Sequence, residues 1–194
     1  MFRSLVIVPF AALAACASPT PPSVSATDIA AADAERQRIS LLPDVAGTDL
    51  PTSSVDYSGN FLSNNLMIDG EGGYGVLGDL AMTIDFGGSN RVSGSVRNLN
   101  LTERGAPDQL LGGRLDIRGS SSGGDIVARA SGELDAVNDL LPFRGTTNVE
   151  FAMTGGTRQD GNDTAVFGTW VGASTSVDDD FFVTGSGTFF GTED

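Results

Sequence analysis

The chain has 194 residues, enough for one domain of ordinary size or one domain with a tail. Its 25 acidic and 11 basic residues give a net charge of −14; all the basic residues are arginine, histidine is missing, and there is one cysteine. These counts exclude a His-based triad, a Lys Schiff base, an intramolecular disulfide and a His/Cys zinc site. They also predict an acidic surface that repels nucleic acid.

Residues 1–15 have the pattern of a signal peptide. Arg3 precedes an apolar stretch from Leu5 to Ala15 that is too short to span a bilayer comfortably. The stretch ends in Leu13-Ala14-Ala15-Cys16, which resembles the lipobox of bacterial lipoproteins. That resemblance implies cleavage before Cys16 and acylation of this residue, palmitate included, and several acyl chains anchor a protein stably. The alternative is an ordinary secretory signal in which the cysteine stands by chance.

The residue after Cys16 bears on the membrane to which the protein is sorted. In enteric bacteria an aspartate at this place favours retention in the inner membrane, whereas this chain has Ala17. The sequence therefore predicts an outer-membrane lipoprotein. It leaves open whether the protein is exposed at the cell surface or faces the periplasm.

Residues 16–44 are predicted to form the acylated tether with a short helix. The Pro/Ser-rich stretch 17–26 is expected to be extended and mobile, because it has too few apolar residues for a core. A helix start is indicated at Thr27-Asp28, and Pro43 ends the helical spacing. Its weakly apolar stripe either packs on the domain, covers an open end, or leaves the helix loose in the tether.

Residues 45–194 are predicted to form the barrel domain. From about Val55 onward, apolar and polar residues alternate with a period of two, which is typical of half-buried strands. Turn signals separate the segments, among them Asp160-Gly161, and a bulge is indicated near Asn98. Short helical turns are predicted at 105–111 and 137–141. The expected strands are 55–61, 80–86, 92–101, 115–117, 126–134, 149–153, 165–173 and 181–190.

Eight consecutive strands joined by hairpins predict an all-β fold. An antiparallel up-and-down β-barrel of lipocalin-like form suits this order, with the first strand paired to the last so that no sheet edge is left free. Two packed sheets are the alternative. The interior of such a barrel is either packed or open to one small ligand.

Seven segments along the predicted strands carry a resemblance to a known family. They are Tyr57-Ser58-Gly59, LAMTIDF (80–86), VSGSV (92–96), ARASGEL (128–134), VEFAMTG (149–155), AVFGTWVG (165–172) and GSGTFFG (185–191). In this order they resemble the C-terminal barrel of factor H-binding lipoproteins and the barrels of transferrin-binding protein B-like surface lipoproteins. The resemblance implies an eight-stranded barrel on an acylated tether, and binding of iron-carrier proteins, complement regulators or haem, according to the member. Haem-binding relatives use histidine, which is missing here.

Asp178, Asp179 and Asp180 form the densest acidic run of the chain. Carboxylates suit Ca²⁺, but the spacing of a calcium-binding loop is missing, so a solvated loop is the better interpretation and no metal site is predicted. No cofactor is predicted either.

The last two strands are strongly aromatic. Alternation places Phe182 and Phe190 on one face of the last strand, which is either an exposed patch or covered by the N-terminal helix. If exposed, Trp170, Phe182 and Phe190, together with the aspartate run 178–180, are the candidate partner contacts.

The sequence favours a binding protein over an enzyme, because its carboxylates alternate with apolar residues on strands or lie in turns, where solvent-facing charge belongs. The predicted function is an outer-membrane or cell-surface lipoprotein that is anchored through Cys16 and binds a protein or small ligand as a monomer. The alternatives are an integral eight-stranded outer-membrane barrel and a lipocalin-like carrier of an apolar molecule.

Overall fold

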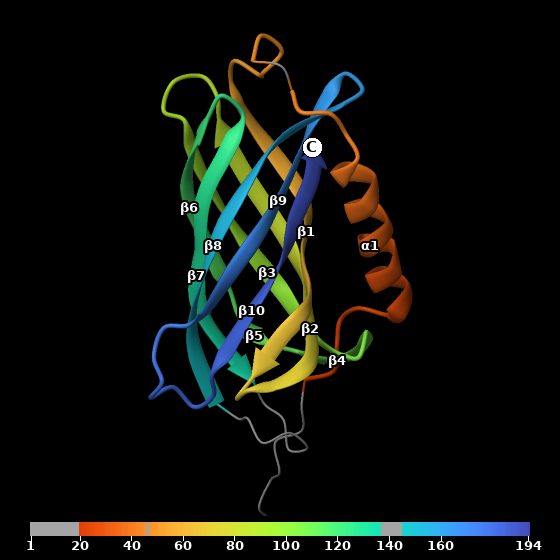
Figure 1. The fold of residues 1–194 in the computed structure, drawn as a ribbon, viewed down its shortest axis with the longest axis vertical. Coiled ribbons are helices and arrows are strands. Elements are labelled where there is room, and N and C mark those ends of the chain that lie inside the picture. Colours follow the sequence, from red (N-terminus) through yellow and green to blue (C-terminus); the bar gives the residue numbers. More distant parts are fainter. Residues whose placement is uncertain (1–19, 46, 137–144) are drawn as a thin grey trace, which may run out of the picture.

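The structure is a computed structural model that describes residues 20–45, 47–136 and 145–194 (Figure 1). It is mostly β, at 66%, as the sequence predicts. Its elements are α1 (Ala26–Ser40), β1 (Ser54–Ile68), β2 (Glu71–Asp85), β3 (Arg91–Glu103), β4 (Ala106–Leu110), β5 (Gly112–Gly113), β6 (Leu115–Ser122), β7 (Asp125–Ala136), β8 (Gly145–Asp160), β9 (Asp163–Ser174) and β10 (Val183–Glu193).

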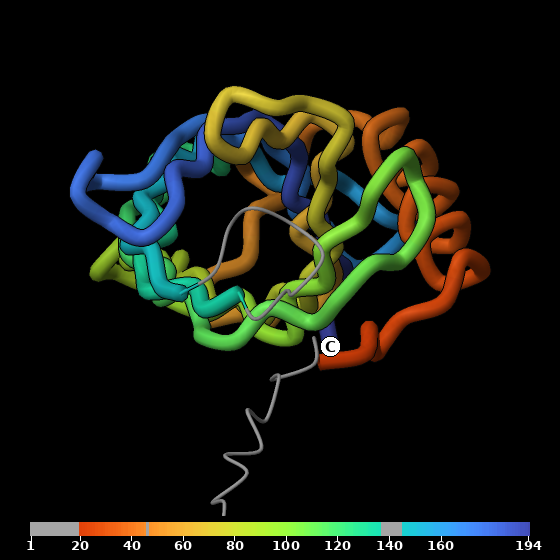
Figure 2. Tube along the Cα trace, turned by 90° about the horizontal axis from the view of Figure 1, so that it is seen from below, coloured from red at the N-terminus to blue at the C-terminus, as the bar shows by residue number. Residues whose placement is uncertain are grey.

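Eight strands close into an antiparallel barrel, which confirms the predicted fold. The order around the barrel is β1, β2, β3, β6, β7, β8, β9 and β10, and β10 pairs again with β1. In the closing pair Phe61 lies opposite Phe189. Figure 2 shows the ring along its axis. The alternative of two packed sheets is therefore wrong.

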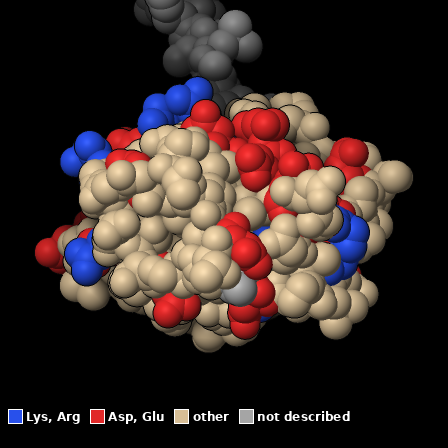
Figure 3. Space-filling view, turned by 90° about the horizontal axis from the view of Figure 1, so that it is seen from above, with Lys and Arg blue, Asp and Glu red and all other residues tan. Residues whose placement is uncertain are grey.

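The two ends of the barrel are called the upper and lower end, as they stand in Figure 1. Figure 3 looks onto the upper end, where carboxylates are spread over the surface and arginines lie nearer its margin. The upper end carries the turns 86–90, 123–124 and 161–162. The lower end carries the hairpin 69–70, the turn 104–105 and the loop 175–182.

Several connections differ from the prediction. Residues 105–111 do not form a helical turn: β4 pairs with the end of β3, where Thr102 lies opposite Pro107, and this pairing gives the backbone groups partners. The hairpin at Asp69 and Gly70, with φ of 50° and 83°, joins two strands longer than predicted. The bulge predicted near Asn98 is confirmed by the φ of 48° at this residue and by a register shift between β2 and β3, in which the extra residue lies on β3. The turn predicted at 137–141 lies outside the described residues.

Side chains fill the barrel interior. The indole of Trp170 stacks on Phe61, with 4.4 Å between ring centroids and 9° between planes, and Phe151 packs against the indole at 4.8 Å. The indole N–H donates to the carbonyl of Thr188 at 3.2 Å. The apolar space left toward the lower end is about 20 Å³, which is room for about one water molecule. The described interior is therefore a packed core.

Helix α1 lies against the outside of the barrel (Figure 1). It begins one residue before the predicted Thr27, where the Ser25 hydroxyl accepts from Asp28 N–H and the Asp28 carboxylate accepts from Ser25 N–H. The pKa of the Asp28 carboxyl is lowered because this group accepts hydrogen bonds from both the N–H and the hydroxyl of Ser25. The buried face of α1 packs on the outer wall of the barrel, which is one of the three alternatives that the sequence predicts for this helix. Its cluster comprises Ala32, Ile39, Leu62, Leu77, Ala165 and Phe190.

The segment before α1 is not the free tether that the sequence predicts. The carbonyl of Thr20 accepts from Leu110 N–H at 3.0 Å, and Ser23 N–H donates to the side chain of Asn100 at 2.7 Å. Asn100 is fully buried and also donates to the Ser23 hydroxyl at 3.0 Å. From Thr20 onward the chain is therefore fixed to the lower part of the barrel.

A buried polar network joins the strands that close the barrel. The Tyr57 hydroxyl on β1 lies 2.7 Å from the Thr164 hydroxyl on β9. Thr164 donates to the Glu193 carboxylate on β10 at 2.8 Å. Tyr57 is 1% exposed, and burial raises the pKa of its phenol to about 12.

This network predicts loss of stability in alkali. An unfolded phenol loses its proton near pH 10, whereas folded Tyr57 keeps it until about pH 12. Stability therefore falls as the pH rises through this range, by about 2–3 kcal/mol in total. Urea unfolding between pH 8 and 12 measures the fall. Tyr57→Phe should be less stable at pH 8, by about 1 kcal/mol, but should lose less than the parent on going to pH 12. Equal losses would contradict the assignment.

Candidate functional site

Two of the predicted partner contacts are inside the protein. Trp170 is 2% exposed and belongs to the core of the barrel, and Phe190 is fully buried beneath α1. Neither side chain offers a surface to a partner in this structure. Alternation holds for Phe189 and Phe190, which face opposite sides of β10, and the helix covers the outer one. Phe182 precedes β10 and does not share a strand face with Phe190, contrary to the prediction.

Phe182 is half-buried and lies in the loop of the lower end. Its N–H donates to the Asp69 carboxylate at 2.8 Å, and its carbonyl accepts from Asp69 N–H at 2.8 Å. These bonds fasten the loop to the β1–β2 hairpin. The main chain of Phe182 therefore has a structural role.

The aspartate run also serves the fold. The Asp179 carboxylate accepts from Asn148 N–H at 2.8 Å and the Asp180 carboxylate accepts from Thr146 N–H at 2.7 Å, so both tie the loop to the start of β8. Asp178 is exposed. Among the described residues, no group of three or more acidic, Cys or His side chains is placed to hold a metal ion. Cys16 lies outside the described residues.

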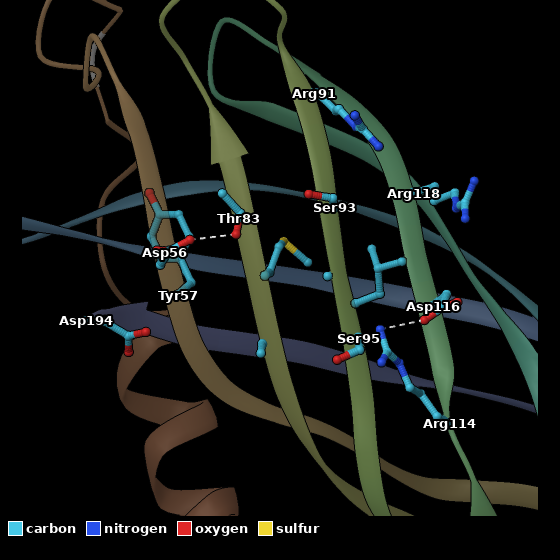
Figure 4. Close-up of a pocket in the computed structure, with 14 residues that line it drawn as sticks. Asp56, Tyr57, Thr83, Arg91, Ser93, Ser95, Arg114, Asp116, Arg118 and Asp194 are labelled. Atoms are coloured by element: carbon cyan, nitrogen blue, oxygen red, sulfur yellow. Dashed lines mark hydrogen bonds and ion pairs between the residues drawn. The ribbon is translucent and has the colours of Figure 1, made fainter.

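The outer wall of the barrel carries a groove of about 470 Å³ over β1, β2, β3 and β6 (Figure 4). We call it the wall groove. Asp56 and Asp194 line one flank, and Ser93 and Ser95 lie on its floor. The other flank carries Arg91, Arg114 and Arg118.

The wall groove follows from strand alternation and register. Residues that point inward at this place, such as Met82 and Ile117, are buried, so their polar neighbours point outward. Cross-strand pairing then aligns the outward residues in rows across the wall. One row consists of Asp56, Thr83, Ser93 and Arg118, and the next of Ala81, Ser95 and Asp116.

The charged side chains of the two flanks differ in the partners they have. On the first flank, Thr83 donates to the Asp56 carboxylate at 2.6 Å. On the other flank, Arg114 pairs with Asp116 at 2.8 Å. Arg91 and Arg118 are exposed, and neither forms an ion pair within the described part of the chain.

Arg118 has a further unfavourable neighbour, since it lies directly opposite Arg129 on β7. Like charges in this position destabilise a sheet. Arg129 pairs with Glu150 at 3.0 Å, whereas Arg118 has no ion-pair partner among the described residues. The groove as a whole is not positive, because Asp56, Asp116 and Asp194 line it beside the three arginines.

Small hydroxyl side chains on the floor leave room above the sheet for a bound group. Arginine presents a planar set of N–H donors that matches carboxylate or phosphate oxygens. Serine and threonine hydroxyls donate or accept, so they suit the hydroxyl groups of a polar ligand. The wall groove can therefore hold an anionic group at Arg91 and Arg118 and a polar remainder over the floor.

Sequence reasoning missed this site. Each of its residues looks like an ordinary solvent-facing residue of a strand, and only the register brings Asp56 and Arg118 into one row. The signal that was available is the grouping of Arg114 and Arg118 around one short strand of an acidic chain.

No protein-family model, curated protein or solved structure matches the chain, so the site is interpreted from its own geometry. No helix within the described ranges is long and apolar enough to cross a membrane.

Proposed function

We propose that the protein is an outer-membrane lipoprotein, anchored by acyl chains at Cys16, that binds a ligand without catalysis. The lipobox-like Leu13-Ala14-Ala15-Cys16 and the resemblance of the strand motifs to transferrin-binding protein B-like lipoproteins support this proposal. The outward side chains of β6 and β7 are chiefly charged or hydroxyl-bearing. Such side chains suit a wall that faces water better than the lipid-facing wall of an integral barrel. The packed interior disfavours a lipocalin-like carrier.

The ligand in this proposal is an anion that binds in the wall groove. The observation that carries it is that Arg91 and Arg118, which form no ion pair with any residue that the structure describes, lie beside a floor of small hydroxyl side chains. Phosphate and carboxylate are the anions that arginine pairs with best. The polar floor favours a sugar-like remainder over an apolar one, because its groups can replace the hydrogen bonds of a hydroxyl.

Binding is tested by NMR titration of the arginine side-chain N–H groups with inorganic phosphate, glucuronate and uncharged glucose. We expect the signals of Arg91 and Arg118 to shift with phosphate or glucuronate, and glucose alone to have little effect. Arg118→Ala or Arg91→Ala should each weaken binding about tenfold or more, since a hydrogen bond to a charged group contributes about 1.5–3 kcal/mol.

Arg104→Ala is the matched control. Arg104 is also an exposed arginine, although it pairs with Glu103, and it lies in the turn at the lower end, away from the wall groove. Its replacement should leave the affinity unchanged apart from a small effect of net charge. If all three substitutions weakened anion binding equally, the binding would depend only on the net charge of the protein, which would contradict a specific site in the wall groove.

A further inference from the structure

We infer that the lower end of the barrel faces the lipid bilayer at close range, with the wall groove held away from it. This inference rests on the acylation of Cys16 proposed above, and adds to it an orientation and a membrane-facing surface. The observation behind it is the place where the chain becomes fixed to the barrel.

The first fixed point is Thr20, whose carbonyl accepts from Leu110 N–H at 3.0 Å at the end of β4. Ser23 follows, bonded to the buried Asn100 on β3 at 2.7 Å. Both contacts are at the lower part of the barrel, where the trace of the described chain begins (Figure 1). Anything that fixes Cys16 in a membrane therefore acts on this end.

The remaining chain is short. Four residue steps separate Cys16 from Thr20, and a fully extended chain of this length spans at most about 14 Å. The barrel is much taller: its longest strand has 16 residues, which at about 3.3 Å per residue and a tilt near 40° gives a wall of roughly 40 Å. The lower end therefore stays within about 14 Å of the lipid, whereas the upper end lies roughly 40 Å farther away when the barrel stands upright.

The surface that faces the lipid is the rim of hairpin 69–70, turn 104–105 and loop 175–182. The loop places Val177 there with 86% of its side chain exposed. Asp69, Glu71 and the run 178–180 make the rim acidic, so anionic headgroups repel it over about 8 Å at physiological ionic strength. The distance over which this repulsion acts is shorter than the extended tether. The tether therefore lets the rim lie close to the headgroups without forcing it among them.

The same orientation bears on ligand access. Arg91 is the first residue of β3 and follows directly on the turn 86–90 of the upper end. The wall groove therefore lies toward the end that points away from the bilayer. A ligand reaches it from the aqueous phase, and the membrane does not cover it.

The test uses the full chain, acylated during expression, in vesicles that contain lipid with a nitroxide on the headgroup. Because Cys16 is the only cysteine and its thiol is consumed by acylation, one introduced cysteine carries the fluorophore. Val177→Cys reports on the lower end and Asn162→Cys, in the exposed turn between β8 and β9, on the upper end. We expect quenching of the lower label to be several-fold stronger than that of the upper label.

A flexible Gly/Ser insertion of about 12 residues between Cys16 and Thr20 serves as the control. It adds roughly 20 Å of average reach, so the difference between the two labels should shrink strongly. Equal quenching of both labels without the insertion, or stronger quenching of the upper label, would overturn the orientation. Protein that does not float with the vesicles at all would instead contradict the lipid anchor itself.

Discussion

Trp170→Ala is expected to lower the free energy of unfolding by about 3–5 kcal/mol. The indole is 2% exposed, stacks on Phe61 at 4.4 Å and contacts Phe151 at 4.8 Å, so its removal leaves a cavity between these two rings. It also leaves the carbonyl of Thr188 without the N–H that now donates to it at 3.2 Å. Urea unfolding followed by circular dichroism measures the change, because the variant has no tryptophan left.

Val171→Ala provides the matched control, since this neighbour on β9 points outward and is 62% exposed. It should change stability by no more than about 0.5 kcal/mol. Trp170→Phe keeps an aromatic ring in the stack and should fall between the two, which keeps the test informative where the alanine variant does not fold. A loss below about 1 kcal/mol for Trp170→Ala would contradict the packed core and would reopen a contact role for this residue.

The barrel was predictable from the sequence because alternation is a local property. In segments such as 126–134 and 149–153, apolar and polar residues alternate along the chain, and the structure places these segments in β7 and β8. The hairpin at Asp69-Gly70 carries a strong turn signal too. Gly72 and Gly73 follow it, however, and give the start of β2 the composition of a loop.

The candidate site was not predictable in the same way, because it depends on register. Asp56 and Arg118 come from strands far apart in the sequence, and a shift of one residue in any of the intervening pairs would send one of them to the other face. Residues 105–111 illustrate the same difficulty. Their pairing with β3 depends on where that strand ends, which the local pattern does not reveal.

The helix gives the second large expected effect: Ile39→Ala should weaken the docking of α1 by about 2–4 kcal/mol. Ile39 is fully buried and packs in one cluster with Leu62, Leu77 and Phe190 on the outer wall. Because this cluster is separate from the barrel core, the loss should appear as local opening of the helix. Amide hydrogen exchange in α1 should accelerate about thirtyfold or more, while exchange in β7 and β8 stays unchanged.

Leu41→Ala is the control for this variant, as Leu41 directly follows the helix and is 85% exposed. It should leave exchange in α1 nearly unchanged. Uniform acceleration across the barrel would mean that the helix and the barrel unfold together, which would contradict a separately docked helix.

The docking also bears on orientation, because α1 and the contact of Ser23 with Asn100 keep the chain between the anchor and the barrel short. When the helix opens together with this contact, only the bond from Leu110 N–H to the Thr20 carbonyl still holds the segment, and opening of that single bond lengthens the chain between the anchor and the barrel. Ile39→Ala combined with Asn100→Ala should therefore reduce the difference in lipid quenching between the two ends, as the Gly/Ser insertion does.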